Sequence, residues 1–205
     1  MAVLYTTVTK EARAEQIIEK SRFIATIAPA ESREEAETFF ARVRKEFPDA
    51  THNVPAFVLG ERQQLQWGSD DGEPGGTAGT PIAVFLAKEG LTNVAIVVTR
   101  YFGGIKLGTG GLVRAYTSSA RLAVQAAGKL EVCQQIRMRF AMDYSLLGKL
   151  NNMTSRFPFV IEETAYEECV KPLICFAPED ESAVMAALSD LTGGSLKIIF
   201  RESNY

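Results

Sequence analysis

The sequence predicts an α+β protein built from two domains. In the last third of the chain, strand and helix patterns follow one another in the order β-α-β-β-α-β, which is the split βαβ arrangement of ferredoxin-like folds. The first part has a different backbone, because 11 of the 16 glycines lie between Gly68 and Gly111. A chain of 205 residues, 46% of them hydrophobic, is long enough to bury a core in each part. We therefore expect domains at residues 1–130 and 131–205, with the boundary within residues 128–133.

The first domain is expected to open with an extended segment at residues 21–28, after a polar lead-in. Residues 31–47 predict a helix, because apolar side chains such as Phe40 recur there at helical spacing. Ser32 is the expected N-cap, and Glu35 three residues later completes a capping box. A Pro-Asp pair then ends the helix.

Three further strands are expected before and after the glycine-rich region. Residues 53–59 predict a strand, and residues 63–67 predict its hairpin partner. Residues 93–99 form a run of apolar, mostly β-branched side chains. Such a run is typical of a central strand that is buried on both faces.

Two glycine-rich segments each lead into a predicted helix. SDDGEPGGTAGTP (residues 69–81) precedes a helix at 81–89, for which Thr80 is the expected N-cap. RYFGGIKLGTGG (residues 100–111) precedes a helix at about 112–127. Glycine backbone before a helix start presents free N–H groups and the positive end of the helix dipole, which suits an anion. The alternative is that the glycines allow close packing of helix on strand.

Basic side chains close to these helix starts support the anion interpretation: Arg100, Lys106 and Arg114. Neither the P-loop pattern GxxxxGK[ST] nor the dinucleotide pattern GxGxxG occurs, so two familiar nucleotide sites are excluded.

The first glycine-rich segment also carries three carboxylates, Asp70, Asp71 and Glu73. They can hold a hard cation such as magnesium through oxygen ligands, or they can accept backbone N–H groups and fix their own loop. The loop does not follow the EF-hand pattern. His52, the one histidine, is a candidate general base, but a single histidine excludes a histidine-rich metal site.

The second domain is expected to hold strands and helices at 135–142, 145–156, 159–166, 169–176, 180–191 and 195–200. Its charge differs from that of the first domain. Residues 1–130 hold 15 basic and 14 acidic residues, a balance of +1, whereas residues 131–205 hold 7 and 11, a balance of −4. Neither value resembles the strong positive excess of a typical nucleic-acid binder, so any such contact must be local.

The chain is expected to be cytoplasmic. It has no apolar run near the length that spans a bilayer and no secretory signal pattern. Its three cysteines, Cys133, Cys169 and Cys175, form no CxxC pair, so neither a disulfide framework nor a zinc site is expected.

Four segments together resemble the bacterial, YigZ-like branch of the IMPACT family: KSRF (20–23), FPDATHNVPAFVLG (47–60), SDDGEPGGTAGTP (69–81) and VVTRYFGGIKLGTGGLVRAY (97–116). The resemblance implies a first domain with the ribosomal-protein-like α/β fold of elongation factor G, including a left-handed βαβ crossover. It also implies that the second, ferredoxin-like domain resembles the last domain of that factor.

The leading functional expectation is a non-catalytic regulatory or binding protein of translation that contacts RNA, the ribosome or a translation factor. One alternative is a phosphate- or metal-dependent enzyme that uses Asp70, Asp71 or Glu73. Another is a protein-docking module whose acidic second domain meets a basic partner. No cofactor, resident metal or membrane contact is expected, and the oligomeric state stays open. The expected binding surface comprises His52, Asp70, Asp71, Gly72, Glu73, Gly76, Thr77, Gly79, Arg100, Tyr101, Gly103, Gly104, Lys106, Gly108, Gly110, Gly111 and Arg114.

Overall fold

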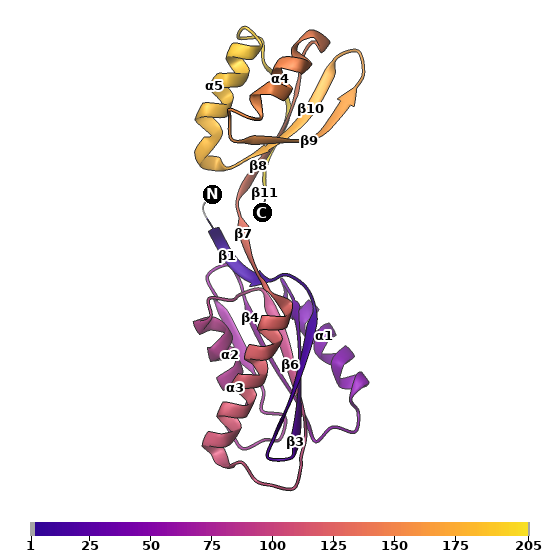
Figure 1. Ribbon diagram of the computed structural model, residues 1–205, viewed down its shortest axis with the longest axis vertical. Helices are drawn as coiled ribbons and strands as arrows, with labels where there is room; N and C mark the ends of the chain where they lie inside the picture. The colour runs from indigo at the N-terminus through magenta and orange to yellow at the C-terminus, as the bar shows by residue number, and fades with distance from the viewer. Residues whose placement is uncertain (1–2, 205) are drawn as a thin grey trace. The chain divides into compact units, whose positions relative to one another are not determined.

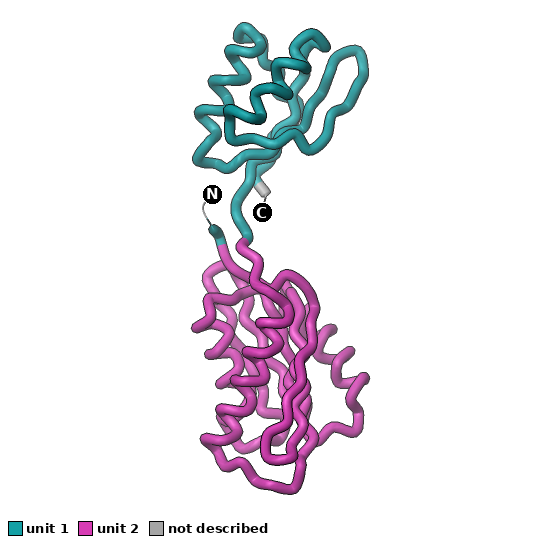
Figure 2. The backbone as a smooth tube through the Cα atoms, viewed as in Figure 1, with its two compact units in different colours: residues 1–4, 132–205 teal, residues 5–131 magenta. Residues whose placement is uncertain are grey.

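The structure is a computed structural model that describes residues 3–204, and the chain divides into two compact units (Figures 1 and 2). The first unit holds Tyr5–Glu131. The second holds Val132 and the residues after it, together with the start of the first strand. Among the described residues, no helix is both long enough and apolar enough to cross a bilayer.

The first unit is built on a five-stranded antiparallel sheet with the strand order β2-β3-β6-β4-β5. The strands are β2 (Ala12–Ile18), β3 (Ser21–Pro29), β4 (His52–Leu59), β5 (Leu65–Gly68) and β6 (Val94–Tyr101). The central position of β6 and its burial on both faces confirm the prediction for the apolar run. The hairpin of β4 with β5 is confirmed as well.

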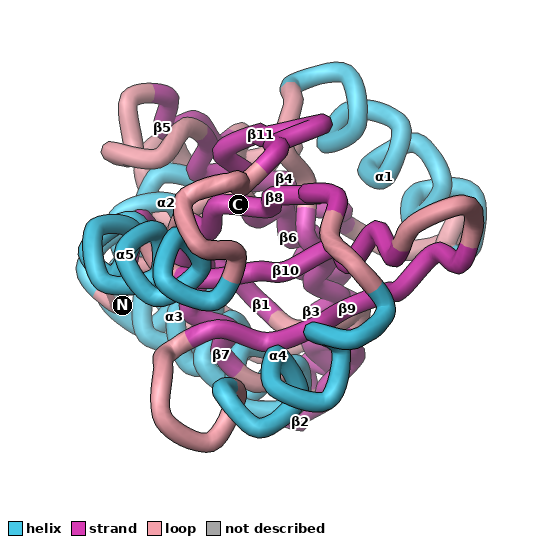
Figure 3. Tube along the Cα trace, turned by 90° about the horizontal axis from the view of Figure 1, so that it is seen from above, coloured by secondary structure: helices cyan, strands magenta, loops and turns pink. Residues whose placement is uncertain are grey.

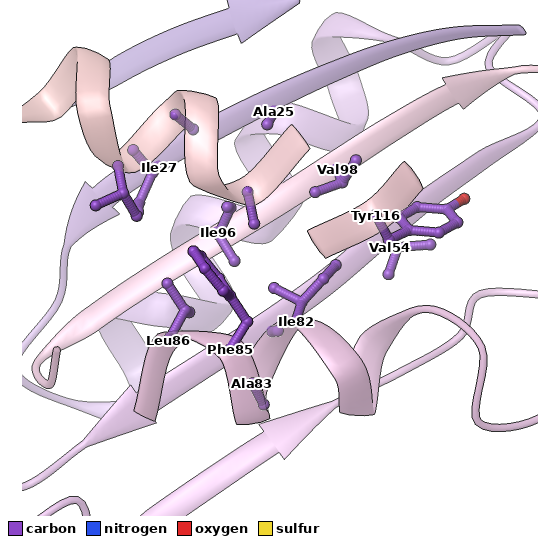
Figure 4. Close-up of a cluster of buried hydrophobic side chains, with 14 of the residues drawn as sticks. Ala25, Ile27, Val54, Ile82, Ala83, Phe85, Leu86, Ile96, Val98 and Tyr116 are labelled. Carbon is purple, nitrogen blue, oxygen red and sulfur yellow. The ribbon is translucent and has the colours of Figure 1, made fainter. Parts of the chain in front are cut away.

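Three helices cover the two faces of this sheet (Figure 1). Helix α1 (Arg33–Glu46) packs Phe39, Phe40 and Val43 on one face. Helices α2 (Gly79–Lys88) and α3 (Gly108–Ala127) pack on the other face. Figure 4 shows side chains of α2 meeting those of the central strand, with Tyr116 of α3 beside them.

Of the three predicted helix starts in the first unit, the structure confirms one and corrects two. Ser32 caps α1 as expected, accepting a hydrogen bond from the backbone N–H of Glu35. Thr80 does not cap α2, because that helix already begins at Gly79 and its N-cap position, Ala78, has no side-chain oxygen. Helix α3 begins at Gly108, about one turn earlier than expected, so its glycines lie inside the first turn.

Three strands of the structure are missing from the sequence interpretation. β1 (Val3–Val8) pairs with β7 (Lys129–Cys133) in a two-stranded sheet, where only a polar lead-in and a domain boundary were expected. β2 is an edge strand on which no side chain is fully buried, so its apolar periodicity is weak.

The turn between β2 and β3 consists of two residues, Glu19 and Lys20, because Ile18 pairs directly with Ser21. Both turn residues have left-handed backbone, with φ of 46° and 61°. This is the geometry of a two-residue hairpin turn, which usually selects asparagine and glycine.

The second unit is a four-stranded antiparallel sheet with the order β11-β8-β10-β9, which Figure 3 shows side by side. Its elements are β8 (Gln135–Ala141), η1 (Tyr144–Leu146), α4 (Leu147–Met153), β9 (Phe159–Tyr166), β10 (Val170–Phe176), η2 (Pro178–Asp180), α5 (Glu181–Leu191) and β11 (Lys197–Asn204). Leu150 of α4 and Leu188 of α5 share one core with the sheet. The ferredoxin-like prediction is therefore confirmed. The expected helix at 145–156 is shorter, because its first turn is a 3-10 turn.

The loop after β6 lies against the β2–β3 turn, and we expect the contact to be sensitive to one added methyl group. A Cβ atom at Gly103 would lie 2.0 Å from the backbone carbon of Lys20. Gly103→Ala should therefore lower the free energy of unfolding by about 1–3 kcal/mol, as overpacking does. Gly75→Ala is the matched control, because a Cβ there meets nothing within 4 Å. Equal urea denaturation midpoints for the two variants would contradict this contact.

Candidate functional site

Three neighbouring strands bring side chains together at one end of the sheet, on the face that α2 and α3 cover. Along β6, Val94 and Val98 pack under these helices, so the period of two directs Arg100 to the same face. Arg100 is in register with His52 of β4 and Phe23 of β3. Because cross-strand partners share a face, the three side chains gather there.

Glu73, from the first glycine-rich segment, forms a buried ion pair with Arg100. The Arg100 Nη1 donates to Glu73 Oε1 over 2.7 Å, and the two side chains are only 6% and 3% exposed. Nη2 donates to the Ser21 hydroxyl over 3.3 Å. The rings of Phe23 and Phe102 each have their centre 5.4 Å from the guanidinium carbon. The Nε–H of Arg100 is buried and has no hydrogen-bond partner among the described residues.

Tyr116 completes this cluster, and the sequence analysis missed it. Its hydroxyl donates to Glu73 Oε1 over 2.6 Å. Burial raises the pKa of Tyr116 far above its usual range, and the hydrogen bond to Glu73 raises the pKa further. Tyr116 therefore acts as a neutral donor. A sequence signal exists, because Tyr116 interrupts a stripe of small and aliphatic side chains on α3, and a buried phenol needs a hydrogen-bond partner.

His52 contacts the same carboxylate from the other side. Its Nδ1 lies 2.7 Å from the backbone carbonyl oxygen of Asp71, which assigns the proton to Nδ1. Its Nε2 lies 3.7 Å from Glu73 Oε1. Gly72 lies against the ring, since a Cβ atom there would be 3.4 Å from Nδ1.

Asp70 fixes the start of α2. Its Oδ1 accepts the N–H groups of Ala78 and Gly79, each over 2.9 Å, and its Oδ2 accepts the N–H of Gly76 over 2.7 Å. Burial alone would raise the pKa of Asp70, but these three N–H donors outweigh it and lower the pKa below its ordinary value. The anion expected at this helix start is thus the protein's own carboxylate.

Asp71 holds the loop against β4. Its Oδ2 accepts the backbone N–H of Asn53 over 2.6 Å, and its Oδ1 accepts from Arg44 over 3.0 Å. The alternative prediction of a magnesium site on Asp70, Asp71 and Glu73 is therefore wrong, because each carboxylate is directed to different protein groups. Residues 3–204 also contain no cluster of three histidine, cysteine, aspartate or glutamate side chains placed to hold a metal ion.

The second glycine-rich segment meets the first at a cavity of about 380 Å³. Glu73 and Arg100 lie in its wall together with Phe102, Lys106 and Thr109. In the described part of the chain, no side chain caps α3, and its first turn holds no acidic residue. The N–H groups at this helix start therefore differ from those of α2, which Asp70 occupies.

The remaining predicted positions are spread around this cavity. Thr77 is buried and donates to the carbonyl oxygen of Pro74. Tyr101 alternates to the opposite face of the sheet, where its hydroxyl donates to Asp49, so it does not join the cluster. Arg114 lines a neighbouring hollow with Ile105 and Lys106. Gly104 lies in the loop that enters α3, and Gly108 and Gly111 lie in the first turn of the helix.

The glycines were expected either to allow close packing or to leave a helix start open to an anion, and different glycines fit the two interpretations. Close packing requires Gly79, because a Cβ there would lie 2.5 Å from the backbone of Ser69. Gly110 has no such requirement, because the nearest atom to an added Cβ is an Arg114 side-chain nitrogen at 3.7 Å. The open glycine thus lies at the uncapped helix start.

Comparison with known proteins shows which family contains this chain. Residues 19–124, more than half of the chain, match the Impact N-terminal domain, and residues 140–195 match a domain of unknown function, DUF1949. The chain belongs to the IMPACT family. Both glycine-rich segments lie inside the region that matches the Impact N-terminal domain.

Other IMPACT family members share nearly the full length of the chain. IMPACT family member YvyE of Bacillus subtilis is 38% identical over 98% of this chain and 93% of its own. IMPACT family member YigZ of Escherichia coli is 35% identical over 89% and 90%. A crystal structure described only as that of a hypothetical protein has a TM-score of 0.61 and 32% identity, covering 95% of each chain. The similarity to these proteins therefore extends over both units.

We expect Asp70→Ala to lower the free energy of unfolding by about 2 kcal/mol at pH 7, because three N–H groups lose a charged acceptor. The folded-state pKa is lowered, so the stabilisation is present above the unfolded-state pKa of about 3.9 and is lost as pH falls through the folded value. Urea denaturation between pH 7 and pH 3 measures this. Glu61→Ala, at an exposed position, serves as the control. A difference between Asp70→Ala and wild type that stays constant with pH would contradict the capping role.

Glu73→Ala should cost about 3–5 kcal/mol of unfolding free energy, because it leaves the Arg100 charge buried without its partner. The double variant Glu73→Ala/Arg100→Ala should cost less than the sum of the two single variants. Tyr116→Phe removes one hydrogen bond and should cost about 1 kcal/mol. A double-mutant cycle by chemical denaturation measures the coupling. Strict additivity would refute the buried pair.

Proposed function

We propose that this protein is a regulatory or binding protein of translation that contacts RNA through one end of its first unit. We call this end the loop end and define it by Lys20 of the β2–β3 turn, Phe102, Ile105 and Lys106 of the loop after β6, and Arg114 of α3. The proposal takes its translation context from the fold that the family resemblance implies, and its RNA contact from the chemistry of the loop end.

One observation carries the RNA contact: three cations without an ion-pair partner belong to the same loop end as two exposed apolar side chains. Within residues 3–204, no salt bridge involves Lys20, Lys106 or Arg114, although most other basic side chains of this unit are paired. The side chain of Phe102 is 46% exposed and that of Ile105 is 37% exposed. Unpaired cations bind phosphates, and an exposed aromatic ring can stack on a base.

The loop end also has a defined shape. The backbone of Gly103 lies against that of Lys20, and the Gly103 N–H donates to Ser21 over 3.2 Å. Lys106 and Arg114 line the same hollow. A strand of RNA would therefore meet a preformed surface, which lowers the entropic cost of binding.

A 5′-hydroxyl single-stranded RNA should bind with a salt dependence that reports the three cations. At about 0.7 released counterions per contacted phosphate, affinity should fall roughly 20-fold between 50 and 200 mM salt. Lys106→Ala and Arg114→Ala should each reduce the slope of log K against log salt by about 0.7. Phe102→Ala should weaken binding by roughly fivefold or more at an unchanged slope. Fluorescence anisotropy measures all of these values.

Lys88→Ala is the matched control for this experiment, because it removes an exposed lysine at the far end of α2 and should leave binding unchanged. A flat salt response, together with wild-type affinity for Phe102→Ala, would refute the RNA contact.

A further inference from the structure

The cavity at the start of α3 joins two side chains of the loop end, Phe102 and Lys106, to Arg100 and to a helix start. We propose that this cavity binds a phosphate monoester, with the phosphate at the helix start and the group esterified to it against the apolar wall. For the RNA source of such a phosphate, the inference rests on the proposed function. For the free nucleotide source, it stands by itself.

The helix start supplies the first set of donors. The N–H groups in the first turn of an α-helix have no partner within the helix, and the aligned peptide dipoles favour an anion there. α3 is 20 residues long, and within the described chain no side chain caps it. Gly108, with φ of 70°, and Thr109 line the cavity, and both residues are exposed.

A second and independent observation is the unpaired nitrogen of Arg100. Its side chain is only 6% exposed and lies in the cavity wall, yet its buried Nε–H has no acceptor among the described residues. A buried unsatisfied donor costs about 1–3 kcal/mol, so this N–H favours a ligand with an oxygen acceptor.

The charges around the cavity also favour an anion. Glu73 lies in the wall, but its carboxylate is paired with Arg100 over 2.7 Å and accepts from Tyr116. Lys106 lies in the wall as well and has no ion-pair partner in residues 3–204. The local excess of charge is therefore positive.

The rest of the wall is apolar, which distinguishes an esterified phosphate from a free inorganic ion. Pro74, Phe102, Leu107 and Leu112 line the cavity. Its volume of about 380 Å³ lies in the range of small-molecule sites. The ring of Phe102 suits the flat base or sugar of a nucleotide. The shared chemistry is a nucleotide 5′-phosphate, from a free mononucleotide or from the end of an RNA strand.

The test titrates full-length protein with adenosine 5′-monophosphate, adenosine and inorganic phosphate, and follows the amide signals of Gly108, Thr109 and Gly110 by NMR. We expect the monophosphate to shift these signals, phosphate to shift them at higher concentration, and adenosine to leave them unchanged. Thr109→Glu places a carboxylate at the helix start and should weaken monophosphate binding roughly tenfold or more. Gln125→Glu adds the same charge at an exposed position near the far end of α3 and should stay within roughly threefold of wild type.

Two RNA oligonucleotides that differ only in a 5′-phosphate or a 5′-hydroxyl distinguish the sources. A roughly tenfold preference for the 5′-phosphate that Thr109→Glu abolishes would assign the site to RNA ends. Monophosphate binding without that preference would assign it to free nucleotides.

The proposal is overturned if these amide signals move with neither the monophosphate nor the 5′-phosphorylated RNA. It is also overturned if Thr109→Glu binds the monophosphate as well as Gln125→Glu does. The 5′-hydroxyl RNA separates this outcome from failure of the proposed function, because its binding depends on the loop end and not on a terminal phosphate.

Discussion

The buried ion pair of Glu73 and Arg100 joins the two parts of the first unit that carry its unusual backbone. Arg100 extends from the central strand, and Glu73 belongs to a loop with little regular structure of its own. Two charges taken out of water are tolerated only when their hydrogen bonds are met. Tyr116 and Ser21 each meet one of them, so a helix, a strand and a loop are held at one point. The cavity lies beside this point, because Glu73 and Arg100 form part of its wall.

The two glycine-rich segments solve the same problem in opposite ways. Each leads into a helix whose first N–H groups need acceptors. In the first segment Asp70 supplies the acceptor, and the loop closes on itself. In the second segment the charged side chains closest in sequence to the helix start are Lys106 and Arg114, which are donors only. The second helix start therefore has no side-chain cap among the described residues.

Much of the fold could be predicted from the sequence, because β6 and α1 carry strong periodic patterns and a matching cap. β1 and β7 could not, since short strands gain their stability from a partner far along the chain. For the site, the sequence could predict residues that take part, but not the role of each residue. Adjacent carboxylates look alike in a sequence, and their roles depend on which N–H groups the fold brings near Asp70, Asp71 and Glu73. Tyr116 was missed because its partner lies 43 residues away.

The turn formed by Glu19 and Lys20 lowers the conformational stability of the hairpin but contributes a lysine to the loop end. Left-handed backbone costs a non-glycine residue roughly 1–2 kcal/mol, whereas asparagine and glycine adopt it readily. A hairpin optimised for folding alone would carry Asn-Gly here, and it would lose a lysine from the loop end. Substitutions that stabilise this turn are thus expected to raise the free energy of unfolding and to lower the affinity for polyanions. The turn is therefore a poor choice for stabilisation by consensus substitutions.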